Sequence, residues 1–422
     1  MNQVTSCPVK LLPAELDPGI HYFTLCRSSG REGVGHIAIE LPKEIRKAGL
    51  APSVQAWDFA ALAMSVAAAD KAIHRSDSAD GWTRLIELSI YLNQPVVWEA
   101  KRPQLEELLR FLTGDFWVLH FLGGGEPPPK AKNQKQFGAD CVCLLSGGID
   151  SLVGAIDLVS AGKNPLFVSQ VVRGDRKTQK KYAVALGGGN RHCQWSCAIN
   201  HVGPSEKSTR ARSIVFFAFA ALAASAVPSA AGQPVEIVVP ENGFISLNVP
   251  LSPSRFGSLS TKTTHPVYMK RIQSIWDAVG IQAKLVFPYQ GQTKGELLVA
   301  CADQAKLFGL IVDSTSCGKH QRHKLKHCGE CLPCMVRRAA FLKAGKPDTT
   351  AKGYCREQLA LSTSNDVAAA ATAYLRYQAK GIRRFVGGAL SFASHHERIL
   401  YEGVVARGMD EIGQLLVSHN VI

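Results

Sequence analysis

The feature that most constrains the fold of this chain is a glycine-rich turn that separates an apolar run from a helical pattern. The turn is SGGIDS (146–151), within CVCLLSGGIDSLVGAIDLV (141–159). Gly147 and Gly148 carry no side chain, so the backbone can turn sharply there and approach a ligand. The N–H groups and the dipole at the start of the next helix favour a phosphate at the same place. The segment therefore predicts a buried strand, a phosphate-binding loop and a helix.

Three polar side chains of the hexamer strengthen this prediction. Ser146 and Ser151 supply hydroxyl groups, and Asp150 can hold the loop or a Mg²⁺ ion. The turn matches neither GxxxxGK[ST] nor GxGxxG, two familiar phosphate motifs. A glycine pair by itself favours a connection without a ligand, so the prediction depends on what the rest of the chain supplies.

Residues 139–345 alternate short apolar segments with helical patterns. The expected strands are Cys141–Leu145, Leu166–Val172, His192–Ser196, Val235–Val239 and Ala283–Phe287. The expected helices are Ser151–Ala161, Arg176–Leu186, Arg210–Ser225 and Val267–Ala278. Such alternation is typical of an α/β fold whose parallel sheet is covered by helices on both faces.

The flanking segments predict three further parts. Residues 1–122 contain two strand-like segments, IHYFTLCR and VGHIAIELP, and predict an accessory α+β domain, a candidate surface for binding a partner protein. The helical patterns of this domain lie at 57–73, 82–92 and 102–112. Residues 123–138, GGGEPPPKAKNQKQFG, lack periodicity and predict a linker. Residues 346–422 predict a helical extension.

The charge of the chain indicates an anionic partner but does not favour nucleic acid. Among 422 residues, 48 Lys and Arg exceed 34 Asp and Glu, which gives a net charge of +14. The excess is dispersed, and only KHQRHKLKH (319–327) is densely basic. The longest apolar run, 214–227, is too short to cross a bilayer and predicts a buried helix. No secretory signal is visible, so we expect a cytoplasmic protein whose twelve cysteines are thiols or metal ligands.

Four cysteines near residue 330 have the spacing of a metal site. The pattern is C-x10-C-x2-C-x2-C. The two C-x2-C spacings can turn three thiolates toward one point, and a fourth thiolate can come from a preceding loop. The candidate ligands are Cys317, Cys328, Cys331 and Cys334. A closed set of four sulfur ligands is typical of structural zinc. The alternatives are an Fe–S cluster, ordinary buried thiols, or a site in which His320, His323 or His327 replaces one cysteine.

In this context SGGIDS resembles the PP-loop, SGGxDS, of the ATP pyrophosphatases. In that family the loop binds the pyrophosphate that leaves when a substrate attacks the α-phosphate of ATP. The resemblance implies that ATP contacts the residues of the loop. These residues are Ser146, Gly147, Gly148, Asp150 and Ser151.

Two later segments extend this resemblance. STRARSIVFF resembles the arginine loop of the family and implies that Arg212 binds phosphate, although Ser213 stands where Asn is usual. YQGQTKGELL resembles the T-K-x-E segment of the family and implies that Thr293 and Lys294 lie near the nucleotide. The expected catalytic residues are therefore Asp150, Arg212 and Lys294, acting on ATP with Mg²⁺.

The segment T-S-C…CGxCxxCxxR, residues 315–337, resembles the ending of the QueC family, the 7-cyano-7-deazaguanine synthases. The likeness covers about 139–341 and implies a structural zinc on the four cysteines, beside the active site. It also implies that ATP adenylates a carboxylate on 7-deazaguanine. Ammonia then captures the activated carboxylate as an amide, which a second ATP helps to dehydrate.

The two extensions resemble the long QueC-like proteins of bacterial antiphage operons, including the Qat system. That resemblance implies a different acceptor, the N-terminal amine of a partner protein encoded in the same operon. Glu241, Asn242 and Arg337 are the candidates to contact the base, and loop capping is the alternative for the first two. The competing functions are release of the free nitrile, thiolation of tRNA, and a non-enzymatic scaffold.

Overall fold

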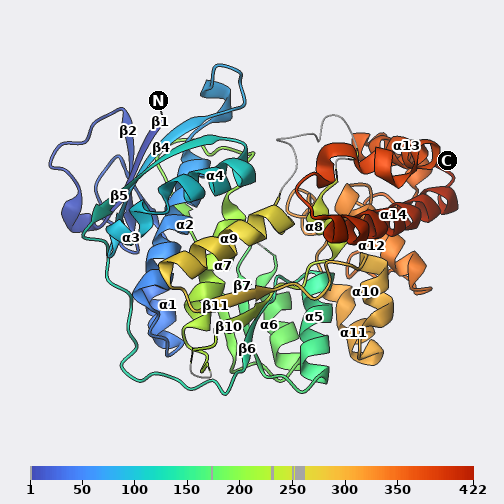
Figure 1. Ribbon diagram of the computed structural model, residues 1–422, viewed down its shortest axis with the longest axis horizontal. Coiled ribbons are helices and arrows are strands. Elements are labelled where there is room, and N and C mark those ends of the chain that lie inside the picture. The colour runs from blue at the N-terminus through green and yellow to red at the C-terminus, as the bar shows by residue number, and fades with distance from the viewer. Residues whose placement is uncertain (1, 173, 230–231, 250, 252–261) are drawn as a thin grey trace.

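The computed structural model describes residues 2–172, 174–229, 232–249, 251 and 262–422. The chain forms two β-sheets with helices between and around them, and two long C-terminal helices pack at one side (Figure 1). Parallel strands dominate both sheets, which confirms the predicted α/β class.

Sheet B, in the centre of the chain, carries the SGGIDS turn. Its five strands are all parallel and lie in the order β11-β10-β6-β7-β8. They are β6 (Cys141–Leu144), β7 (Pro165–Gln170), β8 (His192–Trp195), β10 (Val235–Val238) and β11 (Ala283–Val286). The central β6 has the next strand in sequence, β7, on one side and β10 on the other. The strand order therefore reverses at β6, although all five strands are parallel. A reversal of this kind leaves a crevice at the carboxyl ends of the strands, as in Rossmann-like folds.

The helices around sheet B are α5 (Ile149–Ser160), α6 (Arg176–Ala185), α7 (Arg212–Ala224), α8 (Gly243–Leu247), α9 (Pro266–Val279), α10 (Lys294–Ala300), α11 (Gln304–Leu310) and α12 (Leu332–Lys343). The helices predicted at 151–161, 176–186, 210–225 and 267–278 are α5, α6, α7 and α9, which begin and end close to those positions, and the other helices around sheet B were not predicted. The apolar run at 214–227 forms most of α7, which is buried as predicted. No helix in the described residues is long and apolar enough to cross a membrane.

Sheet A is formed mainly by the N-terminal region and corrects the predicted α+β domain. Its strands are β1 (Asn2–Cys7), β2 (Ile20–Leu25), β3 (Val34–Ile37), β4 (Leu85–Leu92), β5 (Phe116–Gly123) and β9 (Ile199–Asn200). The order is β5-β4-β1-β2-β3-β9, and only the pairing of β9 with β3 is antiparallel among the described strands. The N-terminal region is therefore α/β, and a strand from the central region completes its sheet.

The helix predicted at 82–92 was wrong, because that segment contains strand β4. Its buried residues are Ile86, Leu88, Ile90 and Leu92, which alternate with more exposed neighbours. A period of two places these side chains on one face of a strand. The apolar residues at positions 86, 88, 90 and 92 already show this period in the sequence. The other N-terminal helices are α1 (Leu41–Lys47), α2 (Val54–Ala72), α3 (Pro95–Glu99) and α4 (Arg102–Thr113).

One hydrophobic core joins the two sheets. The alanine-rich α2 packs on sheet A, α7 packs on sheet B, and the two helices pack against each other (Figure 1). The segment predicted as a linker also belongs to this packing. Phe137 is buried in the shared core, and the Ala131 N–H donates to the Leu50 carbonyl oxygen at 2.9 Å. The N-terminal region is thus packed directly onto the central α/β region.

The C-terminal extension is helical, as predicted, and lies near the end of sheet B that carries the SGGIDS turn. Its long helices are α13 (Asn365–Val386) and α14 (His395–Ser418). Helix α14 contacts α8, α10, α12 and α13 (Figure 1). These contacts form a separate hydrophobic cluster and place α14 against α8 and α10, which begin just after Asn242 and Thr293.

Candidate active site

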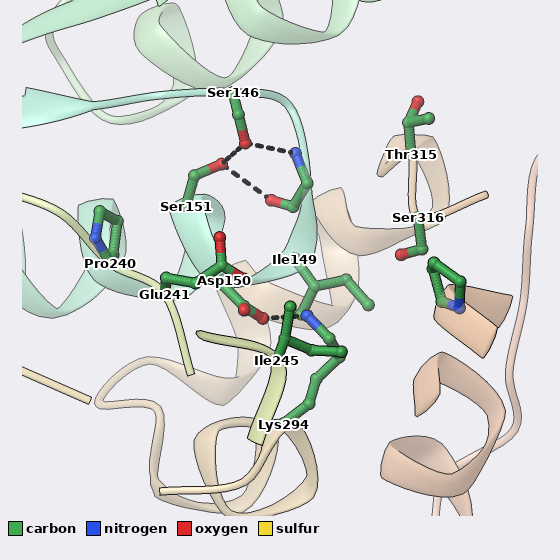
Figure 2. Close-up of a pocket in the computed structure, with 12 residues that line it drawn as sticks. Ser146, Ile149, Asp150, Ser151, Pro240, Glu241, Ile245, Lys294, Thr315 and Ser316 are labelled. Carbon is green, nitrogen blue, oxygen red and sulfur yellow. Dashed lines mark hydrogen bonds and ion pairs between the residues drawn. The ribbon is translucent and has the colours of Figure 1, made fainter. Parts of the chain in front are cut away.

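The SGGIDS turn joins β6 to α5 and is held by its own polar groups. Gly147 has a φ of +91°, in the left-handed region that favours glycine. Ser146 Oγ accepts a hydrogen bond from the Gly148 N–H at 3.3 Å and donates to Ser151 Oγ at 3.1 Å (Figure 2). Ser151 Oγ in turn donates to the Gly148 carbonyl oxygen at 3.0 Å. The predicted order of strand, loop and helix is confirmed, and the loop lies in the crevice of sheet B.

Asp150 is the centre of the buried polar contacts beside the loop. Its carboxylate accepts a hydrogen bond from Lys294 Nζ (Figure 2). It also accepts from the Asn242 N–H at 3.2 Å and from Asn242 Nδ2 at 2.6 Å. Burial by itself would raise the pKa of Asp150, but Lys294, Glu241 and Asn242 lower it below the ordinary value. Asp150 is therefore the ionised partner of the Lys294 ammonium at neutral pH.

The pKa of Glu241, which follows β10, is shifted in the opposite direction. Burial is the main cause that raises its pKa well above the ordinary value, and the negative charge of Asp150 raises it further. Lys294 opposes this shift without reversing it. Glu241 and Asp150 are joined by a hydrogen bond, of the two only Asp150 forms an ion pair with Lys294, and Glu241 is the carboxyl group that more readily holds a proton.

A cavity of about 220 Å³ opens on the β10 side of the loop. The loop, the end of β10 and the segment before α12 line it. The lining residues that carry polar side chains are Ser146, Asp150, Ser151, Glu241, Lys294, Thr315 and Ser316. Figure 2 shows these side chains around the opening, with Thr315 and Ser316 facing the loop from the opposite wall.

A larger cavity of about 640 Å³ opens on the β7 side of the same loop. Cations dominate its charged lining, and Asp175 is the single carboxylate among the described residues that line it. The cations are Lys207, Arg210, Arg212, Lys319 and Arg322. Ser146, Gly148 and Thr315 line both cavities, so the loop forms the wall between them. The two predicted catalytic cations are therefore separated: Lys294 lies in the smaller cavity and Arg212 in the larger one.

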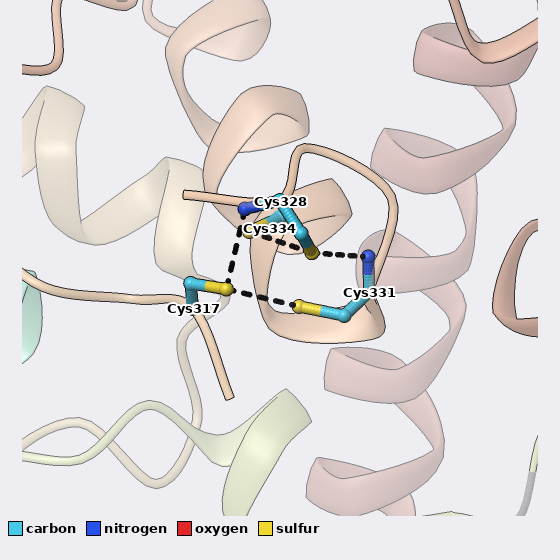
Figure 3. Close-up of side chains that lie close together, drawn as sticks. All are labelled: Cys317, Cys328, Cys331 and Cys334. Carbon is cyan, nitrogen blue, oxygen red and sulfur yellow. Dashed lines mark hydrogen bonds between the residues drawn. The ribbon is translucent and has the colours of Figure 1, made fainter. Parts of the chain in front are cut away.

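The four cysteines converge as predicted. All four Sγ atoms lie within 4.8 Å of one another, and the Cys328–Cys334 and Cys317–Cys331 pairs are each 3.9 Å apart (Figure 3). Tetrahedral zinc with Zn–S bonds of about 2.3 Å separates its sulfur ligands by about 3.8 Å. The cluster is buried and could hold a metal ion such as zinc.

The backbone around the cysteines supports a set of thiolates. The N–H groups of Lys319 and Cys328 both donate to Cys317 Sγ at 3.3 Å, and the Cys331 N–H donates to Cys328 Sγ at 3.3 Å. Donors of this kind favour the charged form of an acceptor. Among the described residues, the metal-ligand group contains the cysteines without a histidine. His327 Nε2 instead accepts a hydrogen bond from the Ser316 N–H at 3.1 Å.

The cysteine knuckle is attached to the SGGIDS loop. The Thr315 N–H donates to the Gly147 carbonyl oxygen at 3.0 Å, two residues before Cys317. A metal ion that orders the knuckle would consequently also order the wall that both cavities share. This contact gives the cysteines a physical connection to the site without requiring them to contact a substrate.

Two residues that the sequence placed near a ligand cap helices in the structure. Asn242 is fully buried, and its Oδ1 accepts a hydrogen bond from the Ile245 N–H at 3.0 Å at the start of α8. Thr293 caps α10 in the same way, accepting from the Glu296 N–H at 3.1 Å. Neither residue lines the two cavities. For Asn242 the capping alternative describes the observed contacts.

Arg337 also has structural contacts. Its side chain is fully buried, donates to Ser314 Oγ at 2.6 Å and forms an ion pair with Asp348 at 3.0 Å. It lines neither cavity, so these contacts give it no position from which to bind the base. It holds α12 against the segment that leads into the cysteine knuckle.

One buried residue that supports the site has no recognisable motif in the sequence. Glu411 of α14 accepts hydrogen bonds from Thr293 Oγ1 and, at 3.3 Å, from the Gly295 N–H. Arg407, one turn earlier, binds the Glu296 carboxylate at 2.5 Å and the Gly291 carbonyl oxygen at 2.7 Å. Both residues hold the turn that precedes and begins α10, where Lys294 lies. No local pattern relates α14 to this turn, because the contact joins distant parts of the chain.

Comparison with known proteins found no match: neither a family model nor a solved structure matches the chain. The chemistry of the site therefore has to be inferred from its geometry. It consists of a loop at a helix N-terminus, a larger cationic cavity on one side, a smaller cavity with one lysine and two carboxyl groups on the other, and a cysteine cluster attached to the shared wall.

Proposed function

We propose that this chain is an ATP-dependent enzyme of the QueC type, which adenylates a carboxylate on a 7-deazaguanine base. The observation that carries this proposal is the SGGIDS loop between two cavities, with Arg212 on one side and Lys294 on the other. A loop at the N-terminus of α5 is suited to bind pyrophosphate, and the flanking cations are suited to offset its charge.

The sizes and charges of the cavities suggest which substrate enters each one. The larger cavity, about 640 Å³ and strongly cationic, has room for ATP, with its phosphates toward Gly148 and Arg212. The smaller cavity, about 220 Å³, suits a bicyclic base. Glu241 lies at its wall and could accept N–H groups from a guanine-like edge or donate its own proton to a carbonyl oxygen.

In the proposed reaction, a carboxylate oxygen of the base attacks the α-phosphorus of ATP. The bond from that phosphorus to the β-phosphate oxygen breaks, pyrophosphate leaves, and an acyl-adenylate forms. An amine then attacks the acyl carbon and loses a proton, AMP leaves, and an amide remains. Lys294 and Arg212 stabilise the charge that develops on the phosphates, and no side-chain nucleophile is required.

The predicted role of Asp150 in binding Mg²⁺ does not fit the arrangement of its contacts. Its carboxylate is already engaged by Lys294 and twice by Asn242. We therefore assign Asp150 to positioning Lys294 and derive no step through Mg²⁺. The cysteine cluster fits zinc, which would stabilise the knuckle and the attached loop.

For the acceptor we propose the N-terminal amine of a partner protein, on the basis of the resemblance to long QueC-like proteins of antiphage operons. Ammonia, which would lead to the free nitrile, is the alternative acceptor. The two are distinguished by the intact mass of the operon-encoded partner after co-expression with and without this chain. An added mass of one deazaguanine unit supports conjugation, and an unchanged mass supports the alternative.

The proposal is tested by pyrophosphate release from ATP with 7-carboxy-7-deazaguanine as substrate. We expect release by the wild-type chain and its loss in the variant that combines Asp150→Ala and Ser151→Ala. Release at the wild-type rate in that variant would contradict the assignment. Transfer of sulfur to tRNA in place of this reaction would favour the tRNA-thiolating alternative, and binding of ATP without turnover would favour the scaffold.

A further inference from the structure

One wall of the larger cavity consists of the loop between β9 and α7. Lys207, Thr209 and Arg210 of this loop line the cavity, and Arg212 follows as the first residue of α7. The loop has no α-helix or β-strand of its own between Asn200 and Arg212. The direction in which these cations face therefore depends on what holds the loop.

The loop is held by the N-terminal region through a buried carboxylate. Asp70 lies near the end of α2 and is fully buried. Its Oδ2 atom accepts hydrogen bonds from the N–H groups of Arg210 at 2.6 Å and of Ala211 at 2.7 Å. Asp70 thus binds the backbone immediately before the first turn of α7. Hydrogen bonds to an ionised acceptor are stronger than neutral ones, so this contact specifies the position of the loop.

Asp70 is itself fixed by a buried arginine. Arg84 Nη2 donates to Asp70 Oδ1 at 2.5 Å and to Asp115 Oδ2 at 2.6 Å. Its other N–H groups bind Asp115 Oδ1 and the carbonyl oxygens of Asp70 and Ile73. Such a fully bonded network leaves the Asp70 carboxylate with little freedom to move.

Further contacts attach the same loop to the same region. Glu206 accepts a hydrogen bond from the Arg75 N–H at 2.9 Å, and its own N–H donates to the Lys71 carbonyl oxygen at 2.8 Å. The Arg210 guanidinium lies over the ring of Trp82 at 4.9 Å. Contacts from α2 and from the segment after it therefore hold the loop at several points.

We infer that Asp70 is a positioning residue of the nucleotide site, which makes the N-terminal region a structural part of that site. Asp70 fixes the loop so that Arg210 and Arg212 face the larger cavity. The identity of the nucleotide rests on the proposed function, whereas the positioning of the cations rests on the contacts above. Loss of this anchor should weaken anion binding in the cavity even though Asp70 does not line it.

The chain offers a matched control on the same helix. Asp58 of α2 is also fully buried and also accepts backbone N–H groups, those of Asn93 at 3.0 Å and Gln94 at 2.9 Å. These contacts hold the turn after β4 and do not involve the loop before α7. Asp58→Asn and Asp70→Asn therefore each replace a buried carboxylate that accepts two backbone N–H groups but affect different loops, and Asp70→Asn also removes an ion pair with Arg84.

The test compares the two variants of the full-length chain in two measurements. Hydrogen exchange of the Arg210 and Ala211 amides should be about tenfold faster in Asp70→Asn and unchanged in Asp58→Asn. Binding of inorganic pyrophosphate and of ATP, measured by calorimetry, should be about tenfold weaker in Asp70→Asn alone. If Asp70→Asn fails to fold, Glu206→Gln serves instead, because it removes the second anchor and should change both measurements in the same direction.

The outcomes separate this inference from the proposed function. Unchanged exchange at Arg210 and Ala211, or faster exchange with unchanged affinity for pyrophosphate, would overturn the inference. The inference would be supported if the wild-type chain binds pyrophosphate and Asp70→Asn binds it more weakly. If the wild-type chain also shows no turnover of ATP, the same result would contradict the proposed function. A wild-type chain that binds neither pyrophosphate nor ATP would contradict both.

Discussion

The two sheets of this chain share one strand order but differ in the connection that follows the central strand. The parallel strands of sheet A run β5-β4-β1-β2-β3, with the antiparallel β9 beyond β3, and sheet B runs β11-β10-β6-β7-β8. In each, the first strand is central, the next two lie on one side and the last two on the other. In both sheets the strand order therefore reverses beside the central strand, although the strands there remain parallel, and this is where ligands bind in open α/β sheets.

The connections decide which of these places can bind an anion. In sheet B, β6 leads through Gly147 and Gly148 into α5, a helix of 12 residues. In sheet A, β1 leads through Pro8 into a single 3₁₀ turn of 3 residues, Val9–Leu11. Only the first connection presents free N–H groups and a helix dipole at the carboxyl end of its sheet. Strand order thus provides a crevice, and the loop determines its chemistry.

Removing a cysteine ligand should produce the largest difference between the sheets. Cys334→Ala should abolish zinc binding and lower the melting temperature by about 10 °C, because structural zinc contributes several kcal/mol to folding. Cys7→Ala, at the end of β1 in sheet A, removes a buried thiol without this effect on metal content. Elemental analysis and thermal unfolding check the pair. Equal loss of zinc in both variants would contradict the assignment of the ligands.

The next largest effect is expected from the lysine of the smaller cavity. Lys294→Ala should lower kcat/KM for pyrophosphate release by about 100-fold, because a preorganised cation is lost beside the leaving group. The control is Lys10→Ala, an exposed lysine in the turn that follows β1 of sheet A. Pyrophosphate release by the control should equal that of the wild type. An equal loss of pyrophosphate release in both variants would contradict the assignment of the site to sheet B.

A smaller effect should follow from the C-terminal helix that supports sheet B. Glu411→Ala removes the acceptor of the Thr293 hydroxyl and should cost about 1–3 kcal/mol of stability, since a buried donor loses its partner. The same substitution should displace Lys294, which follows Thr293, and lower the rate of pyrophosphate release by about tenfold, mainly through kcat. Glu402→Ala, on the same helix, removes an ion pair with Arg398 and should change stability by less than about 0.5 kcal/mol. Urea unfolding and steady-state kinetics measure both variants.

The pH dependence of stability should reveal the protonation of Glu241. Its pKa is raised in the folded chain, above the value near 4.3 that is typical of unfolded Glu. Its favourable contribution is therefore complete below about pH 4.3 and is lost as pH rises through the folded pKa. Glu241→Gln, which cannot ionise, should gain stability relative to the wild type as pH rises. Unfolding midpoints from pH 5 to 8 test this, with Glu236→Gln on the exposed side of β10 as control.

The smallest effects on stability are expected at two residues that have a positive φ, Gly147 after β6 and Ala38 after β3. Gly147→Ala should cost about 1 kcal/mol, because φ of +91° is unfavourable for alanine even though the nearest side-chain atom would be 3.6 Å away. Ala38, after β3 of sheet A, already has a φ of +51°, so Ala38→Gly should change stability by less than about 1 kcal/mol. Thermal unfolding compares the two. A loss of stability in Ala38→Gly larger than that in Gly147→Ala would contradict the argument.

The sequence predicted sheet B better than sheet A because sheet B has clearer local signals. Its strands are short, continuous apolar runs bounded by helical patterns, as in CVCLL before the SGGIDS turn. In sheet A, β4 is half-exposed on one face, and its segment also contains apolar residues at helical spacing, so the prediction of a helix there was wrong. The antiparallel strand β9 has only 2 residues, too few for any periodicity to be detected.

The sequence by itself determined the groups that lie close together along the chain, namely the SGGIDS loop and the closely spaced cysteines. Short spacing limits the conformations available to such groups, so their local geometry follows from residue type. Only the tertiary structure decided which distant residues meet. Asp150 and Lys294 are 144 residues apart, Asp70 and Arg210 are 140 apart, and Thr293 and Glu411 are 118 apart. Contacts of this range arise from the packing of whole elements, which local periodicity does not encode.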